Sequence, residues 1–451
     1  MTPEEITAGA RTIVHLAGYF DELGQTVEKL LEDARASRRG YFTPSEEETV
    51  RRLQVSYWQS RGALFDVALS FRDDRKLSET VRPEAFLVAY AAAVLLVHAA
   101  RFLRESFEPL PAVREKLNEP EPSFGIPQGM YDTVQKSLTS PRHAWHLYHA
   151  MRYFDEHERE LRAKASDPLL AGVMSVIDRL GDRMRVPASR YVKARLKVRA
   201  NRAIGRLQHG LLGRALYGIQ KLAASMAEGV FTRPGHRPNL PEQVARDFRQ
   251  LLEPGDVLIT RKEYAVTNYF LPGYWKHAAL YLGEPAVLEQ LGLAEYDAVK
   301  PRWEKLLGGE ALDRHRVLES LKDGVWIRST ASPFSADAVV AIRPRLARAD
   351  VAEALARGLF HEGKMYDFDF DFTRADRLVC TEVIYRSYDG IGGTSFELTP
   401  RAGRMTLAAV DLVSMALKRD RFEPLAVYMP GQGLQLARDE EAVRLLDQTR
   451  R

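Results

Sequence analysis

The stretch "LVCTEVIYRSYDGIGG", residues 378–393, contains Cys380, the only cysteine in a chain of 451 residues. Its apolar spacing predicts a helix that begins near Leu378 and is stopped by Gly390. Cys380 then lies in the first turn, where unpaired backbone N–H groups and the helix dipole lower the pKa of a thiol. The competing interpretation is an inert buried thiol, because free cysteines are often buried. A nearby base would decide between the two.

A histidine opens an apolar segment upstream of this cysteine. The stretch "GYWKHAALYLG", residues 273–283, predicts a strand that starts at His277, with His277, Ala279 and Tyr281 alternating onto one face. A thiol nucleophile needs an imidazole to take its proton, and the imidazole needs an acceptor that orients it. These groups need only be close in space, so their separation along the chain is no objection.

Two carboxylates are candidates for the orienting acceptor. Glu319, within "RHRVLESLKDGVWIRS" at 314–329, lies on the next clear strand after His277, and neighbouring strands would bring it beside the imidazole. Glu289, within "AVLEQLGLAE" at 286–295, follows His277 more closely along the chain. Both candidates stay open at this point.

The periodicity of the chain changes near residue 240. Residues 1 to about 235 space their apolar side chains at threes and fours, which predicts helices, and the Pro-rich segment 232–243 breaks that pattern. Short apolar runs then predict strands at "GDVLIT", "HAALYLG", "RVLES", "GVWIRS" and "AVVAIRP". We therefore predict a helical domain over 1–240, an α+β domain over 241–435 and a charged C-terminal tail over 436–451.

Composition narrows the class of protein. A chain that is 45% hydrophobic and 28% charged, with net charge +4, is typical of a globular protein. One cysteine excludes a disulfide scaffold and favours a reducing compartment. Two glutamates stand where a secretion signal would carry positive charge, so we expect a cytoplasmic protein, or one peripheral to a membrane. The apolar run Ala85–Ala100 has 16 residues, fewer than the roughly 20 of a membrane span, which favours a core helix.

Four stretches of the second half together resemble a known family. They are "EPGDVLIT", "KHAALYLG", "VLESLKDGVW" and "KMYDFDFDF…RLVCTEVIYRSY", within about 254–390. In this order they are similar to the permuted NlpC-type papain-like cysteine hydrolases of the YiiX and YaeF kind, which are distantly similar to lecithin–retinol acyltransferase. In that family a Gly-Asp pair opens the first strand, a His leads the next, a Glu follows before Gly-Val, and Tyr-Asp precedes the Cys-Ser/Thr-Glu helix. Papain has its Cys before its His, so the order here is its circular permutation.

The resemblance implies a fold and a site. It implies an α+β protein in which a small antiparallel sheet or barrel packs on helices, after an all-helical N-terminal domain. Cys380 matches the nucleophile, His277 the general base and Glu319 the orienting acid. Tyr366 matches a tyrosine that lies close to the cysteine in relatives and helps to stabilise an oxyanion. Extra residues between Tyr281 and Arg316 depart from the family, and we expect them to form a lid or substrate wall.

The expected activity is hydrolysis of an amide, ester or thioester through an acyl-enzyme on Cys380, with His277 as general base. The expected partner is an acyl-containing substrate, either a peptide amide or an acyl lipid. One alternative is a lipid acyltransferase or phospholipase-like enzyme. Another is a non-catalytic binding protein whose helical domain is the working part. The oligomeric state stays open.

The stretch Arg183–Arg206 has nine Lys or Arg and no acidic residue. Beside an apolar stripe, this pattern indicates docking to an anionic membrane surface. The alternative is a solvated helix paired with acidic helices of the same domain. Nucleic acid is not an expected partner, because no binding module accompanies the charges.

Two motifs contain side chains of the kinds that bind metals. "YDFDFDF", residues 366–372, alternates acid and phenylalanine, which predicts an edge strand with a wet acidic face rather than a cation site, since no full set of oxygen ligands follows. His143, His146 and His149 are spaced by threes, whereas zinc sites commonly use i, i+4 pairs with a distant ligand. We therefore expect no metal and no cofactor.

Overall fold

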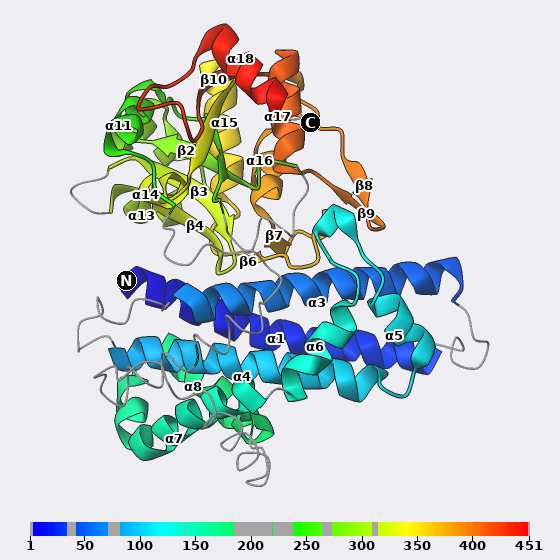
Figure 1. Cartoon of the computed structure of the whole chain (residues 1–451). Helices are drawn as coiled ribbons and strands as arrows, with labels where there is room; N and C mark the ends of the chain where they lie inside the picture. Colours follow the sequence, from blue (N-terminus) through cyan, green and yellow to red (C-terminus); the bar gives the residue numbers. More distant parts are fainter. Residues whose placement is uncertain are drawn as a thin grey trace. The chain divides into compact units, whose positions relative to one another are not determined.

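A computed structural model of the chain describes residues 3–33, 42–70, 82–139, 141–184, 219, 238–263, 273–308 and 314–449. The chain divides into two compact units, Met1–Glu121 with Ile126–Val230, and Pro122–Gly125 with Phe231–Arg451. The first unit is built of helices in its described part, and the second combines an antiparallel sheet with helices (Figure 1). The predicted α+β class, with a helical region followed by a domain in which an antiparallel sheet packs on helices, is confirmed.

The helices of the first unit surround one apolar helix, α4 (Arg82–Phe107). By length and composition α4 could cross a membrane, yet 78% of its most apolar window is buried within the protein, in agreement with a core helix at Ala85–Ala100. It packs against all the other described helices of this unit. The other helices in the described part of this unit are α1 (Pro3–Asp33), α3 (Pro44–Ser70), α5 (Pro111–Leu117), α6 (Met130–Thr139), α7 (Pro141–Lys164), α8 (Pro168–Leu180) and the 3-10 helix η3 (Gly181–Met184).

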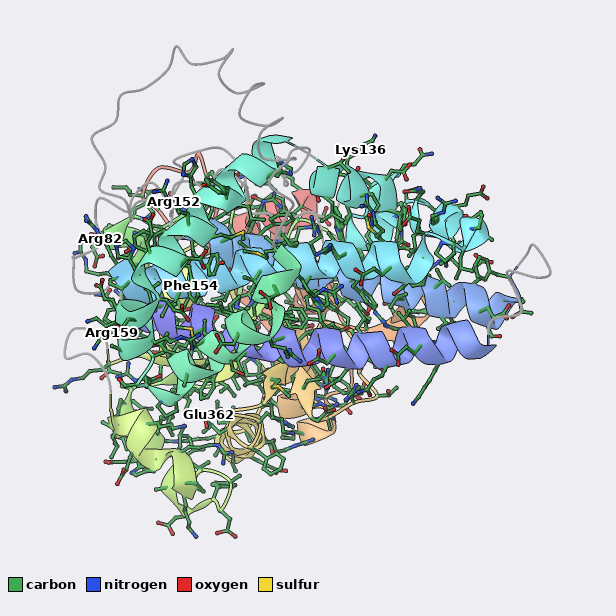
Figure 2. The ribbon with its side chains drawn as sticks, turned by 90° about the horizontal axis from the view of Figure 1, so that it is seen from below. Arg82, Lys136, Arg152, Phe154, Arg159 and Glu362 are labelled. Carbon is green, nitrogen blue, oxygen red and sulfur yellow. The ribbon has the colours of Figure 1, made fainter. Side chains whose placement is uncertain are left out.

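Helix α7 shows how these helices separate an apolar face from a charged one. Phe154 is buried and stacks on Tyr90 of α4, with ring centroids 5.0 Å apart. Arg152 and Arg159, seven positions apart on the opposite face, are exposed (Figure 2). This division is typical of a helix that covers a core on one side only.

The second unit is organised by a six-stranded sheet of order β10-β5-β1-β2-β3-β4, in which all neighbours pair antiparallel. The five strands that the sequence predicts are β1 (Val257–Arg261), β2 (His277–Gly283), β3 (Arg316–Leu321), β4 (Gly324–Ser329) and β5 (Ala338–Pro344). The edge strand β10 (Phe422–Tyr428) was not predicted. Its register shifts between Pro424 and Ala426, and a proline with a bulge interrupts the alternation by which strands are recognised.

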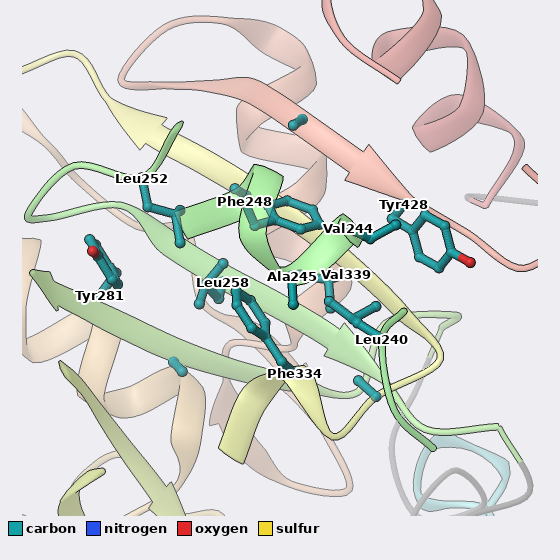
Figure 3. Packing of buried hydrophobic residues seen from close by; sticks show 14 of the residues in the cluster. Leu240, Val244, Ala245, Phe248, Leu252, Leu258, Tyr281, Phe334, Val339 and Tyr428 are labelled. Carbon is teal, nitrogen blue, oxygen red and sulfur yellow. The ribbon is translucent and has the colours of Figure 1, made fainter. Parts of the chain in front are cut away.

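Each face of the sheet has its own helices. On one face α11 (Glu242–Leu251) and the short α14 (Ala331–Phe334) close a buried cluster in which Phe248 and Phe334 pack with Leu258 of β1 (Figure 3). On the other face lie α15 (Arg348–Leu359) and α16 (Cys380–Tyr388). A Cβ on Gly358 of α15 would meet Ser387 of α16 at 2.5 Å and Leu280 of β2 at 3.0 Å, so this face is closely packed.

The remaining elements are short or C-terminal. Helices α17 (Ala409–Lys418) and α18 (Asp439–Gln448) pack against β10. Residues 436–451 were expected as a charged tail, but α18 lies within them and buries Ala442 and Leu446 between its charged side chains. The other elements are β6 (Met365–Tyr366) paired with β7 (Arg377–Leu378), β8 (Thr399–Arg401) paired with β9 (Arg404–Thr406), α12 (Pro285–Gln290), α13 (Trp303–Leu307), and the 3-10 helices η2 (Pro122–Phe124), η5 (Leu293–Glu295), η6 (Lys300–Arg302) and η7 (Ile391–Gly393).

The turn between β3 and β4 is tied to the segment that leads into β6. Val325 donates its N–H to the carbonyl of Lys364 at 2.8 Å, and Gly363 donates to the carbonyl of Val325 at 2.8 Å. Gly324 approaches closely enough that a Cβ would lie 2.4 Å from the Lys364 carbonyl oxygen, and its φ is +107°. Only glycine fits this position without strain.

Gly324→Ala is expected to lower the free energy of unfolding of the second unit by about 3 kcal/mol, because it adds a backbone clash to an unfavourable φ. The matched control is Gly431→Ala, which has a similar φ of +94° but no atom within 4 Å of its Cβ. This control is expected to cost only about 1 kcal/mol in urea unfolding. Equal losses of unfolding free energy in the two variants would contradict the close approach of Gly324 to the Lys364 carbonyl.

Candidate active site

Cys380 is the first residue of α16 and so lies in the first turn of its helix, as predicted, although the helix was expected to begin near Leu378, which belongs to β7. The chain before it is held by two contacts: Ser320 of β3 donates its hydroxyl to the carbonyl of Leu378 at 2.6 Å, and β7 pairs with β6. Cys380 is 6% exposed. Its sulfur accepts hydrogen bonds from the backbone N–H groups of Thr381 and Ala278, both of which favour a thiolate.

His277 is the first residue of β2, where it pairs with Thr260 of β1. Its Nε2 lies 2.7 Å from Oε2 of Glu319, and the imidazole is also the hydrogen-bond partner of the Cys380 thiol. Because Nε2 is engaged by the carboxylate, Nδ1 is the ring nitrogen left for the sulfur. The imidazole therefore stands between a thiol and a carboxylate.

Glu319 reaches His277 because of the register of β2 with β3. Leu280 lies opposite Leu318 in this ladder, which places Glu319 opposite Ala279 and on the same face as His277. Glu319 is 1% exposed. The rival candidate Glu289 is exposed on α12, so the structure places Glu319 and not Glu289 against the imidazole.

The second oxygen of Glu319 has partners that the sequence did not suggest. Oε1 accepts a short hydrogen bond from the hydroxyl of Ser332 on α14 and lies 3.5 Å from Nε of Arg328 on β4. Arg328 is itself paired with Asp323 at 2.6 Å. These partners come from separate elements, and no spacing along the chain relates them to His277.

The three groups shift one another's pKa values. Burial acts to raise the pKa of Glu319, but the hydrogen bond and charge of His277 outweigh it and lower that pKa to about 2. Burial acts to lower the pKa of His277, but Cys380 and Glu319 raise it to about 9. Burial likewise acts to raise the pKa of Cys380, and the charge and hydrogen bond of His277 bring it below the ordinary thiol value. The arrangement thus favours a thiolate, an imidazolium and a carboxylate.

Tyr366 lies at the end of β6, opposite Leu378 of β7. Burial, with the charges of Cys380 and Asp367, raises the pKa of Tyr366 well above its ordinary value, so its hydroxyl keeps its proton. Tyr366 is near enough to Cys380 for their charges to interact, and it can donate a hydrogen bond to an anion formed there.

The expected edge strand over residues 366–372 is wrong, since only Met365–Tyr366 is strand. Asp367 is fully buried, and its carboxylate accepts the backbone N–H groups of Asp369 at 2.9 Å and Asp371 at 2.6 Å. A short acidic side chain that binds its own backbone in this way makes a turn instead of a strand. The phenylalanines of the motif are buried in the protein.

The described extra residues after Tyr281 do not line the cavity at Cys380. Tyr296 and Ala298 line a cavity of about 540 Å³ together with Phe360 of the turn after α15 and Tyr385 of α16. The cavity that contains Cys380 is a different one, and none of its described lining residues comes from this insertion. The insertion therefore walls a space beside the C-terminal half of α16.

Two other expectations concern metals and membranes. Among the described residues, no group of three or more His, Cys, Asp or Glu is placed to hold a metal ion. Of the basic stretch Arg183–Arg206, only residues 183 and 184 are described, and the rest lies outside the described part of the chain. Arg183 is paired with Glu105 of α4.

Comparison with known proteins agrees with this geometry. Residues 251–410 match the family model described as "Permuted papain-like amidase enzyme, YaeF/YiiX, C92 family". No curated protein and no solved structure matches the chain. The matched segment includes strands β1 to β5 and α16, and so contains Cys380, His277, Glu319 and Tyr366. The resemblance read from the sequence is thereby confirmed, and residues 251–410 form a permuted papain-like domain of the YaeF/YiiX kind, a hydrolase of papain-like type.

Proposed function

We propose that the protein hydrolyses an amide bond through an acyl-enzyme on Cys380. The observation that carries the proposal is the position of His277, which contacts the thiol on one side and Glu319 on the other. The matched family is described as an amidase, which favours an amide over the ester and thioester bonds that the same chemistry would cleave.

In the first half of the reaction the Cys380 thiolate attacks the carbonyl carbon, and the carbonyl electrons move onto oxygen. The backbone N–H at the start of α16 and the Tyr366 hydroxyl stabilise this oxyanion, a contribution of about 10²–10³ in rate for one such donor. The C–N bond then breaks as His277 gives its proton to the departing amine.

In the second half His277 takes a proton from water, and the resulting hydroxide attacks the acyl carbon. The C–S bond breaks and the thiolate is restored, with the proton again on His277. Glu319 stays ionised throughout and stabilises the imidazolium, because its own pKa is held at about 2.

The proposal is tested by alkylation with iodoacetamide. Because the chain has one cysteine, the rate of cysteine alkylation reports on Cys380 alone. At about pH 7 the wild-type thiol is expected to react faster than free cysteine, and His277→Ala is expected to slow the reaction by about 10-fold or more, because the thiolate is lost. His157→Ala on α7 serves as the control. If the wild type reacts no faster than free cysteine and His277→Ala changes nothing, the proposal fails.

The pH dependence of alkylation follows from the lowered pKa of Cys380 and the raised pKa of His277. Since the pKa of Cys380 is lowered, the alkylation rate of the wild type is expected to reach its plateau below the ordinary thiol pKa of about 8.5. Since the pKa of His277 is raised to about 9, the imidazolium is expected to persist up to that pH, measured by NMR of the ring protons. In His277→Ala the imidazolium no longer offsets the burial of the thiol, so the alkylation curve is expected to move to higher pH. A His277 titration near 6.5 would be incompatible with the ion pair.

Removing the charge of the orienting carboxylate is expected to weaken the thiolate. Glu319→Gln lowers the pKa of His277, because the imidazolium loses its counter-charge, and shifts the alkylation curve to higher pH with a loss of about 10-fold in rate near neutrality. Ser332→Ala is expected to shift the curve in the same direction by less. Glu289→Gln is the matched control, and a shift as large as that of Glu319→Gln would assign the role to Glu289 instead.

A further inference from the structure

The two oxygens of Glu319 have different partners. Oε2 lies 2.7 Å from Nε2 of His277, whereas Oε1 accepts a hydrogen bond from the Ser332 hydroxyl and lies 3.5 Å from Nε of Arg328. In the described part of the chain, His277 and Arg328 are the charged side chains that contact this carboxylate. One buried negative charge therefore has two cations beside it, and the proposed reaction so far uses only His277.

The β3–β4 hairpin explains why Arg328 reaches Glu319. Glu319 lies opposite Trp326 in this ladder and Val317 lies opposite Arg328, so Arg328 and Glu319 are diagonal neighbours on one face of the hairpin. Diagonal neighbours in an antiparallel pair are within reach of long side chains. The Arg328 side chain is 19% exposed, so its charge is screened less than that of a surface arginine.

Arg328 and Ser332 act on the carboxylate in different ways. The Ser332 hydroxyl makes a directional hydrogen bond, which fixes the orientation of Oε1. Nε of Arg328 makes no hydrogen bond to the described residues and lies within ion-pair distance of Oε1. The contribution of Arg328 is a permanent positive charge, because a guanidinium does not lose its proton in proteins.

A second carboxylate moderates that charge. Asp323, in the turn between β3 and β4, lies 2.6 Å from Nη2 of Arg328 and is buried. Its negative charge partly cancels the effect of the guanidinium on Glu319 and His277. The contacts therefore form a series of alternating charge, in which the thiolate of Cys380 is followed by His277, Glu319, Arg328 and Asp323.

The proton transfers of the proposed reaction change the charge next to Glu319. When His277 gives its proton to the departing amine, the imidazole becomes neutral and the buried carboxylate loses that counter-charge. A buried carboxylate without a cation is strongly destabilised. Arg328 keeps its charge at this step, so Glu319 remains compensated while the proton is away from His277.

Resting on the proposed function, we propose that Arg328 shares the charge of Glu319 with His277, and so allows the imidazolium to release its proton to the leaving group more readily than a Glu319–His277 pair alone would. Arg328 acts through Glu319 and is a positioning residue, not a catalytic one. Asp323 sets the strength of the effect, because it attracts the same guanidinium.

The test is a titration of His277, measured by NMR of labelled histidine rings, with His277→Ala identifying the signal. Arg328→Met removes the competing cation and is expected to raise the pKa of His277 by about half a unit to one unit. Asp323→Asn removes the charge that moderates Arg328, and is expected to lower the pKa of His277 by a similar amount. Opposite signs indicate a charge effect, because a loss of packing would disorient Glu319 and lower the pKa of His277 in both variants.

Three further variants separate charge from folding. Arg328→Lys keeps a cation and is expected to leave His277 near its wild-type pKa of about 9. The double variant Arg328→Met/Asp323→Asn removes both charges of the pair and is expected to titrate between the two single variants. If Arg328→Met alone does not fold, Asp323→Asn and the double variant carry the test. Arg444→Met removes an arginine from an exposed ion pair with Glu441 on α18 and is expected to change nothing.

A His277 pKa that falls in Arg328→Met, or that moves in the same direction in Arg328→Met and Asp323→Asn, would overturn the sharing of charge. Failure of this inference is distinguishable from failure of the proposed function. Rapid alkylation of wild-type Cys380, with a His277 titration that Arg328→Met does not move, would retain the nucleophile and overturn only the role of Arg328. Slow alkylation of wild-type Cys380, with His277 titrating near its ordinary pKa of about 6.5, would overturn both.

Discussion

The hydrogen bond between Nε2 of His277 and Oε2 of Glu319, 2.7 Å long, is the interaction on which the site depends. A carboxylate that is 1% exposed is unfavourable unless a positive charge and hydrogen bonds compensate it. The imidazolium supplies that charge, and it in turn stabilises the thiolate of Cys380. Two buried ionisable groups and the half-buried imidazole between them are thus tolerated because each compensates its neighbour.

The antiparallel sheet makes this bond possible. The register of β2 with β3 sets Glu319 beside His277, and β3 also holds the nucleophile, because Ser320 binds the carbonyl of Leu378 two residues before Cys380. Neighbouring residues of one strand therefore orient the base and fix the chain that enters α16. The turn at Gly324 connects the same hairpin to the segment that carries Tyr366.

Two cavities of different character border α16. The cavity beside Cys380 is about 20 Å³ and includes Lys276, whereas the insertion after β2 lines a cavity of about 540 Å³ next to α15 and the C-terminal half of α16. The insertion was expected to form a lid or substrate wall, and its described residues do not line the small cavity.

The sequence by itself determined the strands β1 to β5, the place of Cys380 in the first turn of a helix and the order of His277 before Cys380, because local periodicity and turn residues depend only on near neighbours. It could not choose between Glu319 and Glu289, since that choice depends on a strand register. Nor did it indicate Ser332, whose contact with Glu319 joins two elements that no sequence pattern relates. The alternation of acid and phenylalanine over residues 366–372 predicted a strand where the structure has a turn at Asp367. A buried carboxylate that binds nearby backbone N–H groups can occur in the same alternating pattern as a half-exposed strand. Tertiary structure decided these points, because only packing brings such groups within hydrogen-bond reach.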